Sequence, residues 1–159
     1  MNVEHPDTEP GYRDNVGVTI VNSQAKVLAG EAFYYPGEWL MPQGGIDPDE
    51  SPLEAMRREL REETGLDAVD AEILCELTDW IYYLFKQPQY KDDIFYKGQR
   101  QKWFLLYFDG PVPGPDIAQV QEFSQFGWVE PSWLVRNTAP FLQSVYRQVL
   151  GQFGAHFPR

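Results

Sequence analysis

The pattern of apolar and polar positions divides the chain into short strand-like runs and two helix-like segments. Residues 16–21 form a β-branched run that predicts a buried strand. Residues 26–29 follow a polar turn and are the expected hairpin partner of that strand. Residues 102–108 predict a central strand, and further strands are expected at residues 70–77, 80–85 and 122–129.

The first helix is predicted to follow Ser51, because serine is a preferred N-cap residue. Pro52 suits the first helical position, and Glu54 completes a Ser-x-x-Glu capping box. Leu53, Met56 and Leu60 recur at helical intervals, and Gly65 is expected to end the helix in a left-handed conformation.

A final helix is predicted to begin at Pro140, with Phe141, Val145 and Val149 recurring every fourth residue. Between the strands, residues 86–99 are polar and are expected to form an exposed excursion. The order of strands, helix, strands and helix indicates an α/β protein with a mixed sheet flanked by helices.

Length and composition indicate one folded domain. The 159 residues are 43% hydrophobic and 15% aromatic, which predicts a globular core. Residues 1–10 are polar and are expected to be a flexible N-terminal segment, so the domain is assigned to residues 11–159. Cys75 is the only cysteine, which excludes a disulfide framework, and we expect it to be a small buried hydrophobe.

No signal-peptide h-region and no membrane-spanning run is found, so a cytoplasmic enzyme without a membrane partner is expected. The net charge of −11 argues against a general nucleic-acid binder. A local excess of cations could nevertheless meet a phosphate chain, although a solvated loop explains it equally well. Those cations are Lys86, Lys91, Lys97, Arg100 and Lys102, with only Asp92 and Asp93 among them.

The segment from Gly44 to Leu66 carries the candidate chemistry. On the predicted helix Glu59, Glu62 and Glu63 stand at positions i, i+3 and i+4, so their carboxylates share one face. Such crowding weakens a helix unless a hard cation such as Mg²⁺ or Mn²⁺ binds the oxygens. A solvated acidic face is the alternative for a run of this kind.

The loop before this helix is expected to belong to the same site. Glycine at position 44 lets the backbone approach closely, and its carbonyl could join a metal's ligands. Glu50 and Arg58 are expected to pair with each other or with polar neighbours and to hold the loop against the helix.

These residues have the composition and spacing of the Nudix box, Gly-x5-Glu-x7-Arg-Glu-Leu-x-Glu-Glu-x-Gly-Leu, and the chain resembles the Nudix hydrolases. From about Gly11 to Phe153 it resembles bacterial RNA 5′-pyrophosphohydrolases and the related dinucleoside polyphosphate hydrolases. The matching segments are residues 11–17, 42–46, 98–105, Glu122-Phe123 with Trp128, and 145–147.

The resemblance implies the Nudix fold, an α/β/α sandwich around a mixed sheet, and metal-assisted attack of water on a phosphoanhydride. It implies that pyrophosphate is removed from 5′-triphosphorylated RNA, leaving a 5′-monophosphate. The alternatives are hydrolysis of dinucleoside polyphosphates or nucleoside triphosphates, or an inactive nucleotide-sensing domain. No motif for a protein partner is found.

Site residues are carried over by position. The resemblance implies that Glu59, Glu62, Glu63 and Glu122 are catalytic and bind the metal, with the Gly44 carbonyl as a further ligand. Which glutamate is the general base stays open. Implied substrate contacts are Arg13 and Lys102 to phosphates, Tyr83 and Phe141 to bases, and Gln43 from the glycine loop.

The chain departs from the family at the end of the second strand. Family members carry arginines shortly after this strand, whereas this chain has Gly30-Glu31-Ala32. Leu142 replaces a lysine beside the stacking phenylalanine, and the loop at residues 33–38 is one residue longer. Fewer cations weaken the grip on a triphosphate, so these changes bear on the substrate and leave the metal chemistry intact.

Overall fold

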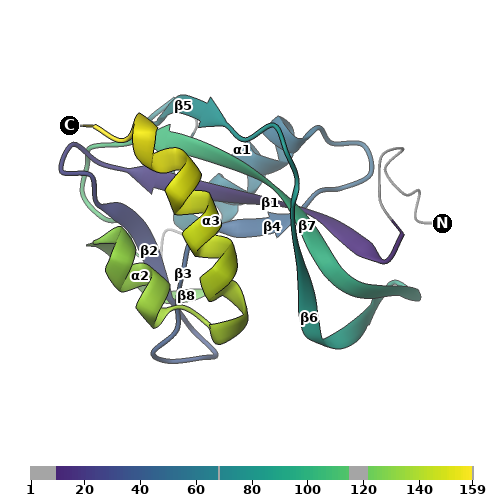
Figure 1. The fold of residues 1–159 in the computed structure, drawn as a ribbon. Helices are drawn as coiled ribbons and strands as arrows, with labels where there is room; N and C mark the ends of the chain where they lie inside the picture. The colour runs from purple at the N-terminus through teal and green to yellow at the C-terminus, as the bar shows by residue number, and fades with distance from the viewer. Residues whose placement is uncertain (1–9, 68, 115–121, 159) are drawn as a thin grey trace.

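Two long parallel strands form the centre of a mixed β-sheet in this computed structural model, which describes residues 10–67, 69–114 and 122–158 (Figure 1). Strand β1 (Tyr12–Val21) lies parallel to β7 (Ile94–Tyr107), with Val16 opposite Lys102. On one side of this pair, β2 (Val27–Ala32) is antiparallel to β1, and β8 (Phe123–Val129) is antiparallel to β2.

Four further strands complete the described sheet. On the other side of the parallel pair, β5 (Glu72–Glu76) and β6 (Ile81–Lys91) are both antiparallel to β7. Strand β3 (Trp39–Leu40) pairs with β2, and β4 (Gln43–Gly45) pairs with β1 at Asn15 to Gly17. The two short strands carry the glycine loop to the edge of β1, directly before the first helix.

Helices cover both faces of the sheet, which confirms the predicted α/β sandwich (Figure 1). Helix α1 (Pro52–Thr64) packs Met56 and Leu60 against alternate residues of β1 and β7. The opposite face is covered by α2 (Pro131–Asn137), the 3₁₀ turn η2 (Pro140–Leu142), α3 (Gln143–Phe153) and the 3₁₀ turn η3 (Gly154–His156). On that face the buried ring of Trp103 contacts Tyr146 edge to face, at a centroid distance of 6.0 Å.

The exposed excursion predicted for residues 86–99 is confirmed in its exposure, but most of these residues form paired strands of β6 and β7, which the sequence did not predict. The two strands form a hairpin that projects from the sheet (Figure 1), and its outer part, residues 84–98, is called here the hairpin arm. Asp92 and Asp93 turn the chain with φ of 51° and 65°, the left-handed pair that suits the twist of a two-residue hairpin. The arm is exposed on both sides, so its sequence lacks the apolar alternation of a half-buried strand.

Three smaller expectations also differ from the structure. The segment from Pro140 begins as the 3₁₀ turn η2, and the α-helix itself starts at Gln143. The short helix α2 was not predicted. Cys75 is only partly buried, since it lies on β5 at the margin of the core.

The flexible segment predicted for residues 1–10 lies almost entirely outside the described residues. Within the described part of the chain, no helix combines the length and hydropathy needed to cross a bilayer.

Candidate active site

The local signals around α1 are confirmed by its geometry. The Ser51 hydroxyl accepts a hydrogen bond from the Glu54 amide at 3.2 Å, and the Glu54 carboxylate accepts from the Ser51 amide at 3.3 Å. At the other end, Gly65 has φ of 76° and donates its N–H to the Arg61 carbonyl. Both ends of the helix are therefore fixed, and so is the direction of the face that carries the glutamates.

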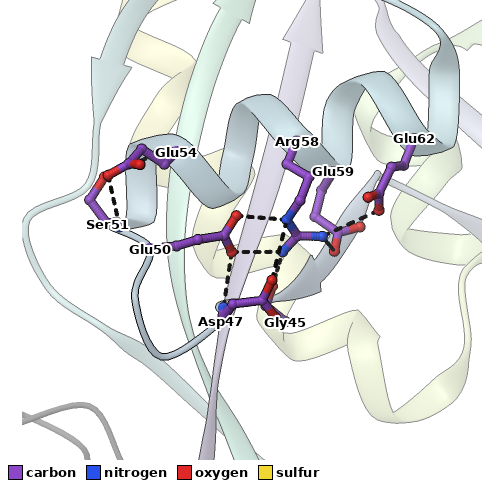
Figure 2. A network of polar contacts seen from close by, with 8 residues as sticks. All are labelled: Gly45, Asp47, Glu50, Ser51, Glu54, Arg58, Glu59 and Glu62. Carbon is purple, nitrogen blue, oxygen red and sulfur yellow. Dashed lines mark hydrogen bonds and ion pairs between the residues drawn. The ribbon is translucent and has the colours of Figure 1, made fainter.

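Arg58 joins the loop before α1 to the acidic face of the helix, as Figure 2 shows. Its guanidinium donates to both oxygens of Glu50, at 2.7 and 2.8 Å, and to the Gly45 carbonyl at 2.8 Å. The remaining nitrogen donates to Glu59 at 2.8 Å and to Glu62 at 3.2 Å. The predicted Glu50–Arg58 pair is thus confirmed, and the same cation also orients two of the candidate ligands.

The glycine loop lies directly against the carboxylates. A Cβ atom at position 44 would stand 1.9 Å from the carboxylate carbon of Glu59, so any other residue there would displace that carboxylate. The Gln43 amide donates to Glu63 at 3.1 Å, and the Gln43 side chain accepts from Gln101 at 2.8 Å. These contacts pack the loop backbone against Glu59 and Glu63.

A cavity of about 400 Å³ opens beside this loop and crosses the end of β1. All four predicted glutamates line it, together with backbone from the glycine loop and side chains from β1, β6 and β7. The lining residues are Arg13, Asn15, Gln43, Gly44, Gly45, Glu59, Glu62, Glu63, Phe85, Gln89, Lys91, Gln99 and Glu122.

Burial disfavours ionisation of Glu59, Glu63 and Glu122, and neighbouring carboxylates add to the effect at Glu59 and Glu63. Burial raises the pKa of Glu63 well above its ordinary value, and the charges of Glu122 and Glu59 add to the effect. Burial raises the pKa of Glu59 despite its contact with Arg58, and it raises the pKa of Glu122, although that side chain keeps an exposed part. A bound cation would offset the cost of holding these carboxylates ionised together.

Within the described residues, no three acidic, histidine or cysteine side chains already stand at the distances of a metal site. Arg58 donates to Glu59 and Glu62, and the Gln43 amide donates to Glu63. The donor set is nevertheless all oxygen and anionic, which fits a hard divalent ion such as Mg²⁺ or Mn²⁺.

Of the two predicted phosphate contacts, Arg13 lines the cavity and Lys102 does not. Arg13 lines the cavity, and a Cβ atom at Gly45 would meet its guanidinium at 2.2 Å. Lys102 is absent from the lining of the described cavity, since its ammonium donates to the Thr78 carbonyl and lies 5.3 Å from the centre of the Trp80 ring.

The two predicted base-stacking rings do lie together. The Tyr83 and Phe141 centroids are 6.0 Å apart at a tilt of 36°, with Tyr83 buried and Phe141 half exposed. The Gln99 side chain donates to the Tyr83 hydroxyl and accepts from Asn15 at 3.1 Å. A buried amide network therefore fixes the Tyr83 ring next to the cavity.

Two parts of the lining were missed by sequence reasoning. Phe85 and Gln89 had no signal, because their place depends on the irregular pairing of β6 with β7 between Leu84 and Gln89. Lys91 belonged to the cationic cluster, but nothing in the sequence separated it from its neighbours. Arg100 is instead buried in an ion pair with Asp14 at 2.6 Å, and Lys97 lies over the Tyr12 ring at 4.9 Å.

The NUDIX domain model matches residues 11–149 of this chain. Among curated proteins, the chain is 40% identical to Nudix hydrolase 26 of Arabidopsis thaliana, a chloroplastic protein, over 92% of this chain and 71% of that one. It is also 40% identical to the RNA pyrophosphohydrolase of Roseobacter denitrificans, over 91% of this chain and 93% of that protein.

The fold resembles solved structures at lower sequence identity. The Ap4A hydrolase of C. elegans, in a binary complex, superposes with a TM-score of 0.65 at 20% identity, covering 90% of this chain and 98% of that one. A MutT protein from Methanosarcina mazei gives the same TM-score and identity. At this identity the likeness concerns the arrangement of helices and strands.

Proposed function

The chain belongs to the Nudix hydrolase family, and we propose that this phosphoanhydride hydrolase removes pyrophosphate from the 5′-triphosphate end of RNA. The cavity carries the proposal, because it gathers four glutamates and places the cations of Arg13 and Lys91 around them. The Roseobacter relative named RNA pyrophosphohydrolase, matched over nearly its whole length, supports the choice of substrate. Such a reaction would serve mRNA decay in the cytoplasm.

Nudix hydrolases generally use divalent metal ions, and the oxygen donors here suit Mg²⁺ or Mn²⁺. In this proposal Glu59, Glu62, Glu63 and Glu122 hold the metal, with the Gly44 carbonyl as a further ligand. The bound ion would neutralise charge on the phosphates and lower the pKa of a coordinated water. A glutamate with a raised pKa is suited to accept a proton from the attacking water near neutral pH.

The substrate is held by cations and rings at the margins of the carboxylates. Arg13 and Lys91 would contact the phosphate chain, where fixed positive charge is most useful. The half-exposed Phe141 ring beside Tyr83 offers a surface for a nucleobase. We retain Gln43 as a substrate contact, whereas Lys102 would first have to leave the Thr78 carbonyl.

A second candidate is hydrolysis of dinucleoside polyphosphates, with free nucleoside triphosphates as simpler substrates. It is favoured by the end of β2, where Gly30-Glu31-Ala32 provides no cation for a terminal phosphate. The lack of cations there weakens binding of a free terminal phosphate. It weakens binding less when the phosphate chain ends in a second nucleoside.

The test is a side-by-side release assay with Mg²⁺ or Mn²⁺ at fixed salt. It compares 5′-triphosphorylated RNA of several nucleotides with diadenosine tetraphosphate and GTP at matched concentrations. We expect the largest kcat/KM for the RNA. A preference for the dinucleotide or for GTP would assign the chain to the second candidate, and no turnover of any of them would contradict the proposed function.

A further inference from the structure

We propose that Gln101, a fully buried residue on β7, is a positioning residue that turns the side-chain nitrogen of Gln43 toward the cavity as a hydrogen-bond donor to substrate phosphate. Gln101 is absent from the lining of the described cavity, so it would act through Gln43, which does line it. The inference rests on the proposed function, because it adds a phosphate contact and its support to the same phosphoanhydride site.

Trp103 sets the direction of the Gln101 side chain. The indole N–H of Trp103 donates to Gln101 at 3.0 Å. An indole nitrogen can donate but cannot accept, so the atom that faces it is the carbonyl oxygen of Gln101. The Trp103 ring is itself fixed, since it is fully buried and packs edge to face against Tyr146. The side-chain nitrogen of Gln101 therefore points away from Trp103.

This nitrogen uses both of its hydrogens. It donates to the Asn15 side chain on β1 at 2.8 Å and to the Gln43 side chain on β4 at 2.8 Å. Because Asn15 and Gln43 each receive an N–H, each presents its oxygen to Gln101. The same order continues beyond Asn15, whose nitrogen donates to the Gln99 oxygen at 3.1 Å, while the Gln99 nitrogen donates to the Tyr83 hydroxyl.

The direction of these amides is the only one in which every bond has a donor and an acceptor. A reversed Gln43 would place its N–H groups against those of Gln101. A reversed Gln101 would place its N–H groups against the indole N–H of Trp103. Either reversal leaves buried donors without acceptors, which costs more than the bond itself contributes. The Gln43 nitrogen is thus kept on the side of the amide that faces away from Gln101.

A nitrogen in that place suits the binding of phosphate. Gln43 lines the cavity with Arg13, and its backbone amide donates to Glu63 at 3.1 Å. A carbonyl oxygen turned into a cavity with four glutamates would add to the repulsion of a phosphate, whereas an N–H donates a charge-assisted hydrogen bond to it. A hydrogen bond with the Tyr83 hydroxyl takes at most one of the two N–H groups of Gln43. The other is left for the substrate.

The test is a double-mutant cycle on Gln43 and Gln101, run on the substrate of the release assay with the highest kcat/KM. Gln43→Met removes the donor, and KM should rise about tenfold, the effect of one hydrogen bond to a charged group. Gln101→Met leaves Gln43 unfixed, and KM should rise about two- to tenfold, the effect of releasing one immobilised side chain. The kcat should change little in either variant, because the carboxylates and the Gln43 backbone amide remain.

The double variant Gln43→Met/Gln101→Met decides the route. Its KM should equal that of Gln43→Met alone, because Gln101 would have no other way to affect the substrate. Increases that multiply in the double variant would show that Gln101 acts through Asn15 or through the fold, and they would overturn the inference. So would an unchanged KM in Gln101→Met.

Trp103→Phe carries the test if Gln101→Met does not fold, because it removes the N–H and keeps an aromatic ring. It should raise KM in the same direction but by less, and an unchanged KM would contradict the inference. Thr19→Val is the matched control, since Thr19 is buried on the same face of β1 as Asn15 and donates to the Met41 sulfur at 3.2 Å. It should lower the melting temperature without changing KM. A KM that rises equally in the control would assign the effect to general loosening of the core and overturn the inference. Failure of the wild-type protein on every substrate would contradict the proposed function instead.

Discussion

At the level of single side chains, Glu63 combines near-complete burial with a negative charge and acidic neighbours. In the variant Glu63→Gln the amide keeps the size of the side chain and removes the charge. We expect turnover to fall by about a hundredfold or more, because the loss of a proposed metal ligand would remove several kcal/mol of transition-state stabilisation. The metal-free variant should melt at the same temperature or higher, because a buried repulsive charge is gone. Phosphate release and thermal melting measure the two effects.

Glu72→Gln is the control for this prediction. Glu72 is exposed on β5, at the opposite end of β7 from the cavity, and faces Tyr107 in the sheet. Both turnover and melting temperature should stay near the wild-type values. Normal turnover of Glu63→Gln would contradict the assignment of Glu63 to the metal.

Side chains fixed by local spacing were predictable, and those placed by strand pairing were not. The Glu50–Arg58 pair and the cap at Gly65 follow from positions within one loop and one helix. Lys91 and Lys102 look alike in the sequence, yet Lys91 lines the cavity while Lys102 donates to Thr78. Their difference follows from strand pairing, because Lys91 lies next to the hairpin turn opposite Ile94, whereas Lys102 lies opposite Val16 on β1.

Among helices and strands, the hairpin arm contributes a cation to the cavity from outside the Nudix box. Partial burial and the nearby charge of Arg13 lower the pKa of Lys91, as expected for a lysine that faces another cation in the cavity. In the variant Lys91→Ala we expect KM for triphosphorylated RNA to rise about tenfold, since a charged hydrogen bond to phosphate contributes roughly 1.5–3 kcal/mol. The kcat should change much less, because the carboxylates remain in place. Steady-state kinetics at fixed salt separates the two constants.

Lys97→Ala is the matched control, because Lys97 lies on the same arm but over the Tyr12 ring. It removes the same charge from the arm without touching the cavity. Equal increases of KM in the two variants would indicate a diffuse effect of net charge and contradict a specific role for Lys91.

The hairpin arm also shows why some strands and helices could not be predicted from the sequence. Helix α1 was predictable with its ends, since capping box, apolar stripe and terminal glycine all agree. The arm has few buried positions, so its strands are held by backbone pairing that leaves no apolar periodicity. Helix α2 spans only Pro131–Asn137, too short for a helical repeat to stand out.

At the scale of the whole protein, the cavity holds the carboxylates that are least favourable to ionise. The net charge is −11, and three of the four cavity glutamates have a raised pKa. A carboxylate with a raised pKa in the folded state binds more protons there than in the unfolded chain. Its contribution to stability is complete below the unfolded value and is lost as pH rises through the folded value. Glu31 and Glu50 have lowered pKa values, so their contribution is already complete above about pH 4.5.

We therefore expect the metal-free protein to lose stability as pH rises from about 5 to 8. Saturating Mg²⁺ or Mn²⁺ should reverse that trend, because the ion binds the ionised carboxylates and its benefit grows with pH. At a hundred times its dissociation constant a ligand adds about 2.7 kcal/mol, which corresponds to roughly 5–10 °C in melting temperature for a domain of this size. Thermal melts at pH 5, 6.5 and 8, with chelator or with metal, measure both slopes. A metal-free melting temperature that rises steadily with pH, or a metal effect as large at pH 5 as at pH 8, would contradict a metal site built from these carboxylates.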